Sequence, residues 1–284
     1  MRRALVLAVM CLVLVQGCTS AFFQPMRQMV LTPARIGLAY QDVYFDAADG
    51  TRLHAWYLPA EGARKGTVLF LHGNAENIST HIASVYWLPP RGYAVLLLDY
   101  RGYGDSGGSQ SLPGALEDSE AAIAWLAARP EVQTQGMAVL GQSLGGSLAV
   151  YAVAHSRYRD KIKALVIDSA FSSYRAIARE VLGRWWLTWA LQWPLSFTVT
   201  DRYSPVASIA DVSPIPLLIL QSEQDQVVPV SHARALYAAA RPPKTLWLLP
   251  DGGHIQALVK EANRRRLTDW LAECFERDGM LTRR

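Results

Sequence analysis

One serine in this chain stands where an apolar strand turns directly into a helix-forming segment. Residues 138–140 are apolar, residues 141–145 follow the pattern G-x-S-x-G with Ser143 at the centre, and residues 144–155 suit a helix. This arrangement exposes the serine hydroxyl on a tight turn, beside the unpaired backbone N–H groups of a helix N-terminus. Ser143 is therefore predicted to be a nucleophile. The alternative is a glycine-rich turn in which Ser143 only caps the helix.

Two later loops carry the partners that a serine nucleophile requires. A serine hydroxyl needs a base, and the base needs an acid to orient it. His254 follows the strand-like residues 245–249, and Asp225 follows the strand-like residues 216–221. His254 is therefore predicted to be the general base and Asp225 the orienting acid. The alternatives are Glu223 as the acid, Asp225 as a turn former or helix cap, and His254 as an exposed loop histidine.

A carbonyl group under attack also needs N–H donors for the charge that develops on its oxygen. The backbone amide of Leu144, directly after the serine, is the first predicted donor. The second is Asn74, in the loop after the strand-like residues 67–71, where Gly73 allows the backbone to turn inward. His72 in the same loop is interpreted as a residue that orients the loop rather than as the base.

The segments around these loops alternate between strand-like and helix-like patterns. Strand-like runs, several of them continuously apolar, cover residues 67–71, 93–98, 137–140, 164–167, 216–221 and 245–249. Helix-like runs between them cover residues 112–128, 144–155, 231–240 and 256–275. An Asp-Gly pair between residues 40–46 and 51–58 predicts a β-hairpin ahead of them. The alternation predicts an α/β fold with a mostly parallel central sheet and helices on both faces.

Two further acidic residues also follow strand-like runs. Asp99, with Arg101, is interpreted as a structural ion pair that shapes the glycine-rich loop after residues 93–98. Asp168 precedes the longest interval between strands, and it is interpreted as structural rather than as the acid of the site.

The interval between residues 167 and 216 has no strand pattern and holds four tryptophans. Long excursions between strands are often functional. Residues of about 172–213 are predicted to form a short helical cap over the nucleophile. Trp185, Trp189 and Trp193 recur every four residues, which places them on one side of a helix, where they are predicted to bind substrate. The alternative is that this apolar side packs on the core.

The N-terminus has the composition of a secretory signal. Arg2 and Arg3 precede an unbroken apolar run at residues 4–15, shorter than the roughly 20 residues that a membrane span needs. The Gly-Cys pair that follows, ending at Cys18, resembles the lipobox of bacterial lipoproteins.

The lipobox resemblance implies a signal peptide over residues 1–17, a lipid attached to Cys18 and a lipidated tether over residues 18–38, with the domain over residues 39–284. Thr19 resembles outer-membrane sorting, so the expected location is the periplasmic face of a bacterial outer membrane. The alternatives are ordinary secretion with an incidental cysteine, or an uncleaved anchor.

Composition limits the partners and cofactors. The net charge is +4, two of the cations lie in the leader, and no run of Lys and Arg with aromatic neighbours suggests a nucleic-acid partner. Of the three cysteines only Cys274 lies in the predicted domain, where a packing role and no internal disulfide are expected. No H-E-x-x-H, Cys/His or G-x-G-x-x-G motif occurs, so neither a metal nor a cofactor is predicted. The oligomeric state stays open.

Five motifs in one order resemble a known family. They are H-G-N-A at residues 72–75, D-Y-R-G-Y-G-D-S-G-G at 99–108, G-Q-S-L-G-G at 141–146, Q-D-Q-V-V-P at 224–229 and G-G-H at 252–254. Together they resemble serine hydrolases of the α/β-hydrolase superfamily, in the branch of protein depalmitoylases and lysophospholipases, over roughly residues 38–276. The resemblance implies the α/β-hydrolase fold and favours Asp225 over Glu223. Residues 221–223 depart from the apolar-His-Gly that is frequent in the branch.

These patterns predict a membrane-tethered serine hydrolase that cleaves carboxylic esters or thioesters through an acyl-serine intermediate. Its expected partners are a small-molecule or acylated substrate and, through the N-terminal lipid, a membrane. Two alternatives remain: a serine peptidase of the prolyl-oligopeptidase type, and a non-catalytic lipoprotein that uses the fold for binding.

Overall fold

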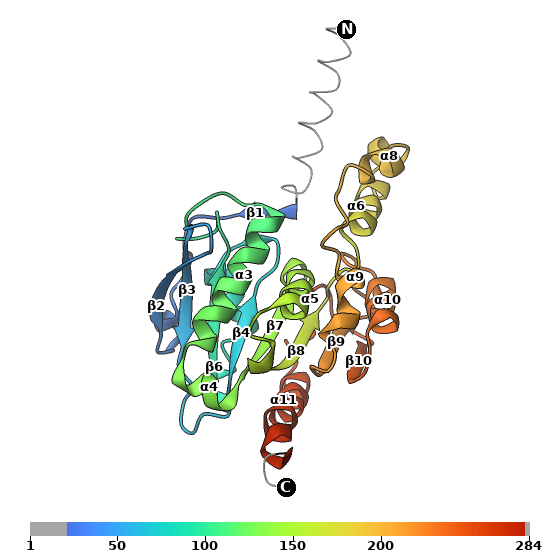
Figure 1. Cartoon of the computed structure of the whole chain (residues 1–284). Coiled ribbons are helices and arrows are strands. Elements are labelled where there is room, and N and C mark those ends of the chain that lie inside the picture. The colour runs from blue at the N-terminus through green and yellow to red at the C-terminus, as the bar shows by residue number, and fades with distance from the viewer. Residues whose placement is uncertain (1–21, 282–284) are drawn as a thin grey trace.

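The computed structural model describes residues 22–281, which are built around an eight-stranded sheet (Figure 1). The strand order is β10-β9-β8-β7-β4-β6-β3-β2, and only β3 runs against its neighbours. The strands are β2 (Gln41–Asp46), β3 (Arg52–Leu58), β4 (Gly66–Leu71), β6 (Tyr93–Asp99), β7 (Met137–Gln142), β8 (Ile162–Asp168), β9 (Leu217–Ser222) and β10 (Lys244–Leu249). The predicted mostly parallel sheet, its hairpin and the α/β-hydrolase fold are confirmed.

The helices occupy both faces of this sheet and its edges. They are α2 (Ile78–His81), α3 (Leu112–Ala127), α4 (Pro130–Gln135), α5 (Leu144–His155), α6 (Tyr174–Gly183), α7 (Trp186–Trp189), α8 (Gln192–Ser196), α9 (Pro205–Ser208), α10 (Val230–Ala239) and α11 (Glu261–Leu281). Short 3-10 turns cover Pro33–Ile36, Ile82–Ser84, Pro89–Arg91, Arg159–Lys161 and Ile209–Val212. Helix α11 begins five residues later than expected, because the preceding residues form the turns that carry His254.

The apolar strands are buried because each face of the sheet has its own core. Alternate side chains of a strand point to opposite faces. Leu69 of β4 packs in the cluster that contains Leu148 of α5, whereas Val68 packs in the cluster that contains Leu267 and Cys274 of α11. All six residues of β4 are buried. The continuously apolar pattern of the sequence is therefore explained by cover on both faces.

The segment expected to be a tether packs on the domain over its described residues. Gln24–Pro25 (β1) pairs in parallel with Ala75–Glu76 (β5), and Phe23 is buried. The side-chain amide of Asn77 donates to two backbone carbonyls of this segment. These contacts hold the described residues from Phe22 onward against the domain, so this part of the segment is not a free tether. Cys18 and the predicted signal peptide lie outside the described residues.

The cap lies between β8 and β9 and contains α6, α7, α8 and α9 (Figure 1). Within it the expected single tryptophan helix is not formed: α7 ends at Trp189, and α8 begins at Gln192. Pro194 explains the break, because a continuous helix would need its missing N–H for a hydrogen bond to Ala190. Proline is tolerated only in the first turn of α8, which is where it stands.

Candidate active site

Ser143 occupies a strained turn between β7 and α5. Its backbone has φ 52° and ψ −118°, a region that non-glycine residues rarely adopt. Glycines permit this turn: a Cβ atom at Gly145 would lie 2.1 Å from the backbone oxygen of Leu71, and one at Gly141 would lie 2.4 Å from that of Gly145. The strand and the helix therefore approach closely, and the serine stands at the carboxyl edge of the sheet.

Three side chains from different loops form one hydrogen-bonded chain. His254, after β10, places Nε2 2.9 Å from Oγ of Ser143. Its Nδ1 lies 2.8 Å from Oδ2 of Asp225, after β9. Because β7, β9 and β10 are parallel, their following loops meet at one edge. The structure thus brings together the nucleophile, base and acid that were predicted for this site.

Asp225 is buried and held by backbone amides. Its Oδ1 accepts hydrogen bonds from the N–H groups of Val227 at 2.8 Å and Val228 at 2.9 Å. The side-chain amide of Gln221 donates to Oδ2 at 3.1 Å. Burial alone would raise the pKa of Asp225, but the hydrogen bonds from His254, Val228 and Val227 hold it below the ordinary 3.8. The carboxylate therefore stays ionised beside the imidazole.

Glu223 does not occupy this position. Its side chain is about half exposed and lies 3.8 Å from Arg234, on the outside of the loop. The geometry favours Asp225 as the partner of His254, in agreement with the resemblance of its loop to the family.

The loop that carries His254 is fixed by two serines that the sequence analysis did not single out. Ser169, after β8, accepts a hydrogen bond from the N–H of Ile255 at 3.2 Å. Ser222, at the end of β9, donates to the carbonyl of Gly252. Ser222 ends β9 and Ser169 directly follows β8, so the sequence could have indicated both serines by their positions at the carboxyl ends of parallel strands. These contacts orient the histidine toward Ser143.

The two predicted oxyanion donors lie beside the serine. Leu144 is the first residue of α5, so its N–H has no partner within the helix. A Cβ atom at Gly73 would lie 3.7 Å from Cβ of Ser143. Nδ1 of His72 lies 2.8 Å from the Gly73 carbonyl, an acceptor, so that nitrogen is the donor. The carbonyl of Gly73 and the N–H of Asn74 belong to one planar trans peptide group, so they point in opposite directions. Because the carbonyl faces Nδ1 of His72, the N–H of Asn74 points away from His72.

Asn74 is anchored from its other side as well. Its carbonyl accepts hydrogen bonds from the N–H of Gln24 at 2.8 Å and the hydroxyl of Tyr103 at 2.6 Å. Asn74, Leu144 and Ser143 line the same cavity. The loop is thus held rigidly, which is what a donor for a transient charge requires.

The expected ion pair between Asp99 and Arg101 is not formed. Arg101 instead pairs with Asp118 at 2.8 Å and Asp49 at 2.8 Å. Asp99 lies below the site, 3.6 Å from Nε2 of His72. Asp99 is the last residue of β6, whereas Arg101 lies in the turn that follows, so the strand no longer fixes the direction of the Arg101 side chain, which reaches Asp118 of α3.

A cavity of about 430 Å³ opens beside the serine. Its walls come from the N-terminal segment, the loop that carries Asn74, the start of α5, the cap and the loop that follows Asp225. The lining residues are Phe22, Gln24, Asn74, Ser143, Leu144, Phe171, Ile177, Ala178, Val181, Leu182, Leu195, Thr198, Val199, Val227 and Val228. None of these side chains is charged. The cap therefore contributes to the walls as expected, mainly through α6 and residues 195–199.

The three tryptophans predicted to bind substrate do not line this cavity. Trp185, Trp189 and Trp193 are 56 to 67% exposed and lie at the end of the cap. The prediction was wrong because their spacing of four assumed one helix, and the chain breaks between α7 and α8. Their exposure also excludes the alternative in which they pack on the core.

Comparison with known proteins agrees with this geometry. The family described as Serine aminopeptidase, S33, matches residues 62–213, more than half of the chain. The chain belongs to this family of α/β-hydrolases.

Relatives of this hydrolase occur in distant organisms. It is 40% identical over 252 residues to the uncharacterized protein YfhR of Salmonella typhi, covering 84% of this chain and 81% of that protein. It is 36% identical over 236 residues to the α/β hydrolase domain-containing protein WAV2 of Arabidopsis thaliana, covering 79% and 75%. An esterase of Pyrococcus furiosus has the same fold, with a TM-score of 0.70 at 21% identity over 90% of this chain and 98% of that one.

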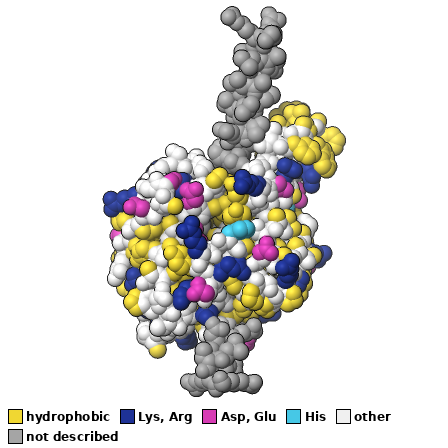
Figure 2. All heavy atoms as spheres, in the orientation of Figure 1, with side chains coloured by type: hydrophobic (Ala, Val, Ile, Leu, Met, Phe, Trp, Pro, Cys, Tyr) yellow, Lys and Arg dark blue, Asp and Glu magenta, His cyan; other side chains and the backbone are white. Residues whose placement is uncertain are grey.

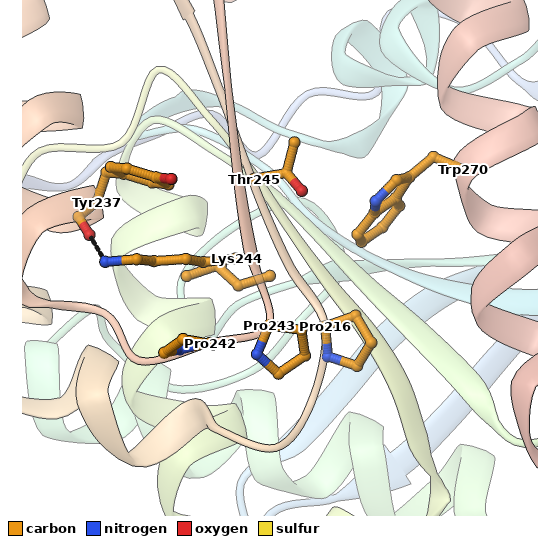
Figure 3. Close-up of a pocket in the computed structure, with 8 residues that line it drawn as sticks. Pro216, Tyr237, Pro242, Pro243, Lys244, Thr245 and Trp270 are labelled. Atoms are coloured by element: carbon orange, nitrogen blue, oxygen red, sulfur yellow. Dashed lines mark hydrogen bonds between the residues drawn. The ribbon is translucent and has the colours of Figure 1, made fainter.

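A second hollow of this hydrolase, of about 320 Å³, lies at the opposite end of the sheet (Figure 3). Pro216 and Pro243 stand where β9 and β10 begin, far from the loops that carry the triad. The ammonium group of Lys244 donates to the carbonyls of Tyr237 at 2.6 Å and Ala240 at 2.8 Å. The lining residues offer no nucleophile paired with a base, so this hollow is not a second candidate for the reaction.

Within residues 22–281 of the hydrolase, no three His, Cys, Asp or Glu residues gather closely enough to hold a metal ion. In the same part of the chain no helix combines the length and apolarity needed to cross a membrane.

Proposed function

We propose that this hydrolase cleaves carboxylic esters or thioesters of acylated substrates through an acyl-Ser143 intermediate. The single observation that carries the proposal is the chain Ser143–His254–Asp225, with distances of 2.9 and 2.8 Å, at the mouth of an uncharged apolar cavity. A nucleophile in hydrogen-bond contact with a base, itself oriented by an acid, is the arrangement that acyl transfer requires.

In the first half-reaction, Nε2 of His254 takes the hydroxyl proton as Oγ of Ser143 attacks the substrate carbonyl carbon. The backbone N–H groups of Leu144 and Asn74 stabilise the resulting oxyanion. When the tetrahedral intermediate collapses, the bond to the leaving alkoxide or thiolate breaks, and the leaving group receives the proton from His254. The acyl group stays on Ser143 as an ester.

In the second half-reaction, His254 takes a proton from water, and the hydroxide attacks the acyl-serine carbonyl. Collapse of the second tetrahedral intermediate releases the carboxylic acid, and His254 returns its proton to Oγ of Ser143. Asp225 stabilises the imidazolium that forms twice in this cycle, because its carboxylate stays ionised and contacts Nδ1.

The cavity supports acyl groups better than peptides. An aminopeptidase must hold the α-ammonium group of its substrate, and a buried cation needs a carboxylate or several acceptors nearby. The cavity walls contain no Asp or Glu, whereas leucine, isoleucine, valine and phenylalanine side chains predominate. Such walls gain free energy from burying an acyl chain. A non-catalytic binding role would not need the aligned histidine and serine.

The proposed function includes attachment to the periplasmic face of a bacterial outer membrane through lipidated Cys18. The support is the positive, apolar and Gly-Cys order of residues 2–18. Mass spectrometry of the mature protein should find lipid on Cys18 at the N-terminus, and Cys18→Ala should release the protein from membranes. An unmodified N-terminus at another residue would contradict this attachment.

The hydrolase activity is tested with a fluorophosphonate probe and p-nitrophenyl esters of increasing chain length. The full chain should react with both, and Ser143→Ala should react with neither, with turnover reduced about 10⁶-fold. Ser109→Ala, an exposed loop serine, is the matched control and should behave as wild type. Equal labelling of the Ser143→Ala protein would rule out Ser143 as the nucleophile.

A further inference from the structure

The end of the cap exposes an unusual concentration of apolar side chains. We call residues 185–197 the cap tip. Its most exposed large side chains, between 56 and 83% accessible, are Trp185, Trp186, Leu187, Trp189, Trp193 and Phe197. Figure 2 shows the tip as a continuous hydrophobic cluster at the upper right, where Figure 1 places α8. Soluble monomers rarely leave so many large apolar groups together in water, so this surface has an occupant.

The charges around the cap tip indicate what kind of occupant it has. Residues 181–200 contain one cation, Arg184, and no acidic residue; the acidic residues that flank this range, Glu180 and Asp201, contact His232 and Ser173. At the base of the tip, the guanidinium of Arg179 lies 4.3 Å from the ring centre of Trp193, and that of Arg175 lies 5.3 Å from that of Phe197. Tryptophan with flanking arginine is the composition of segments that lie at the boundary between lipid headgroups and acyl chains.

The cap tip is continuous with the cavity. Leu195 belongs to the tip, is partly exposed, and also lines the cavity that contains Ser143. Val181 of α6 is likewise exposed and also lines that cavity. An apolar surface therefore runs from the outside of the cap to the nucleophile without an intervening charged side chain in the lining.

The described chain begins beside the cap. Phe22 lines the cavity, and its ring packs against Tyr174, the first residue of α6, with 5.4 Å between ring centres. The apolar run of residues 4–15 ends seven residues before Phe22, so an extended chain between them spans at most about 25 Å. From Cys18 the span is at most about 14 Å. Either attachment to a membrane would bring the cap tip close to its surface.

We propose that the cap tip inserts into the headgroup region of a lipid bilayer, with the cavity mouth facing the acyl chains. Acylated substrates would then pass from the bilayer along the apolar surface to Ser143. This route rests on the proposed function, whereas the insertion does not.

The test uses tryptophan fluorescence of the full chain reconstituted into phosphatidylcholine vesicles, with and without brominated acyl chains. Residues 1–21 contain no tryptophan, so quenching by bromine reports the domain and not the leader. Wild type should be quenched. Trp186→Glu places a charge in the tip and keeps three tip tryptophans, and it should lose most of the quenching.

Tyr158→Glu is the matched control, because Tyr158 is an exposed aromatic residue just before β8, at the end of the sheet opposite to Ser143. It should keep the wild-type quenching. Ser143→Ala should also keep it, which separates docking from hydrolysis. Equal fluorescence of wild type in both kinds of vesicle, or undiminished quenching in Trp186→Glu, would overturn the proposal. The proposal would also be overturned if wild type self-associates and shows no quenching, and Trp186→Glu abolishes the self-association. The tip would then be an interface between copies of the chain.

Discussion

The ring of Phe22 packs edge-on against Tyr174, with 5.4 Å between ring centres and 85° between ring planes. This contact joins the start of the described chain to the first helix of the cap, and Phe22 also lines the cavity that opens on Ser143. Phe22 is thus part of the wall of the candidate active site.

Phe22→Ala should therefore change the preference for acyl-chain length. Removing the ring enlarges the cavity and takes away apolar surface, so kcat/KM for long p-nitrophenyl esters should fall on the order of 10-fold relative to the acetyl ester. Trp189→Ala is the comparison, because Trp189 is exposed and does not line the cavity. It should leave the preference for soluble esters unchanged, and a shift in Trp189→Ala alone would place the acyl site elsewhere.

Asp225→Asn should reduce turnover by about 10⁴-fold, because the amide no longer stabilises the imidazolium or holds the histidine tautomer. Glu223→Gln should change turnover by less than about twofold, since Glu223 faces Arg234 and solvent. The measurement is kcat for a soluble ester at one pH. The reverse ranking of the two variants would move the acid to Glu223.

The rate should fall as the pH is lowered, because a protonated His254 cannot accept the proton of Ser143. The pKa of Asp225 is held below 3.8, so protonation of this carboxylate should not set the acid limb of kcat/KM. A limb near about pH 4, where ordinary carboxyl groups titrate, is therefore not expected. A limb in that lower range would assign the titration to a carboxyl group instead.

Asp168 should make folding less favourable at neutral pH than at low pH. Burial raises its pKa to about 6, although hydrogen bonds from Gln142 and Ser169 oppose the shift. The folded protein then binds the proton more tightly than the unfolded chain, so this contribution to stability is present at low pH and is lost as the pH rises toward about 6.

Urea unfolding of wild type and Asp168→Asn at several pH values measures this contribution. The free energy of unfolding of wild type, relative to the variant, should fall by on the order of 1–3 kcal/mol between about pH 4 and 7. Asp201→Asn is the control of opposite sign, because hydrogen bonds from Ser204, Arg175 and Ser173 outweigh burial and lower the pKa of Asp201. A pH-independent difference for Asp168→Asn would show that its carboxyl group titrates alike in both states.

Gly145→Ala should destabilise the fold strongly. The added methyl would lie 2.1 Å from the backbone oxygen of Leu71, which only a shift of α5 relative to β4 can relieve. Overpacking typically costs about 1–3 kcal/mol and occasionally more, and a clash with the backbone is expected at the upper end; thermal unfolding measures it. Gly183→Ala is the control, because its methyl would meet only the flexible end of Gln192. Similar melting temperatures for the two variants would contradict the close approach.

The sequence by itself determined the alternation of strands and helices and the loops that hold Ser143, Asp225 and His254. Local patterns suffice for this, because apolar runs buried on both faces mark the strands, and parallel strands bring their following loops to one edge. The same reasoning placed Asn74 and Leu144 beside the serine.

Only the tertiary structure decided which neighbours these elements meet. It placed the Asp225 carboxylate against His254 and the Glu223 carboxylate near Arg234 on the outside of the same loop. It paired Arg101 with Asp118 and not with Asp99. It also turned the tryptophans of the cap outward and placed Phe22 in the cavity wall. Periodicity shows that a side of a helix is apolar, but not whether protein or another medium covers it, because that depends on contacts between segments far apart in the chain.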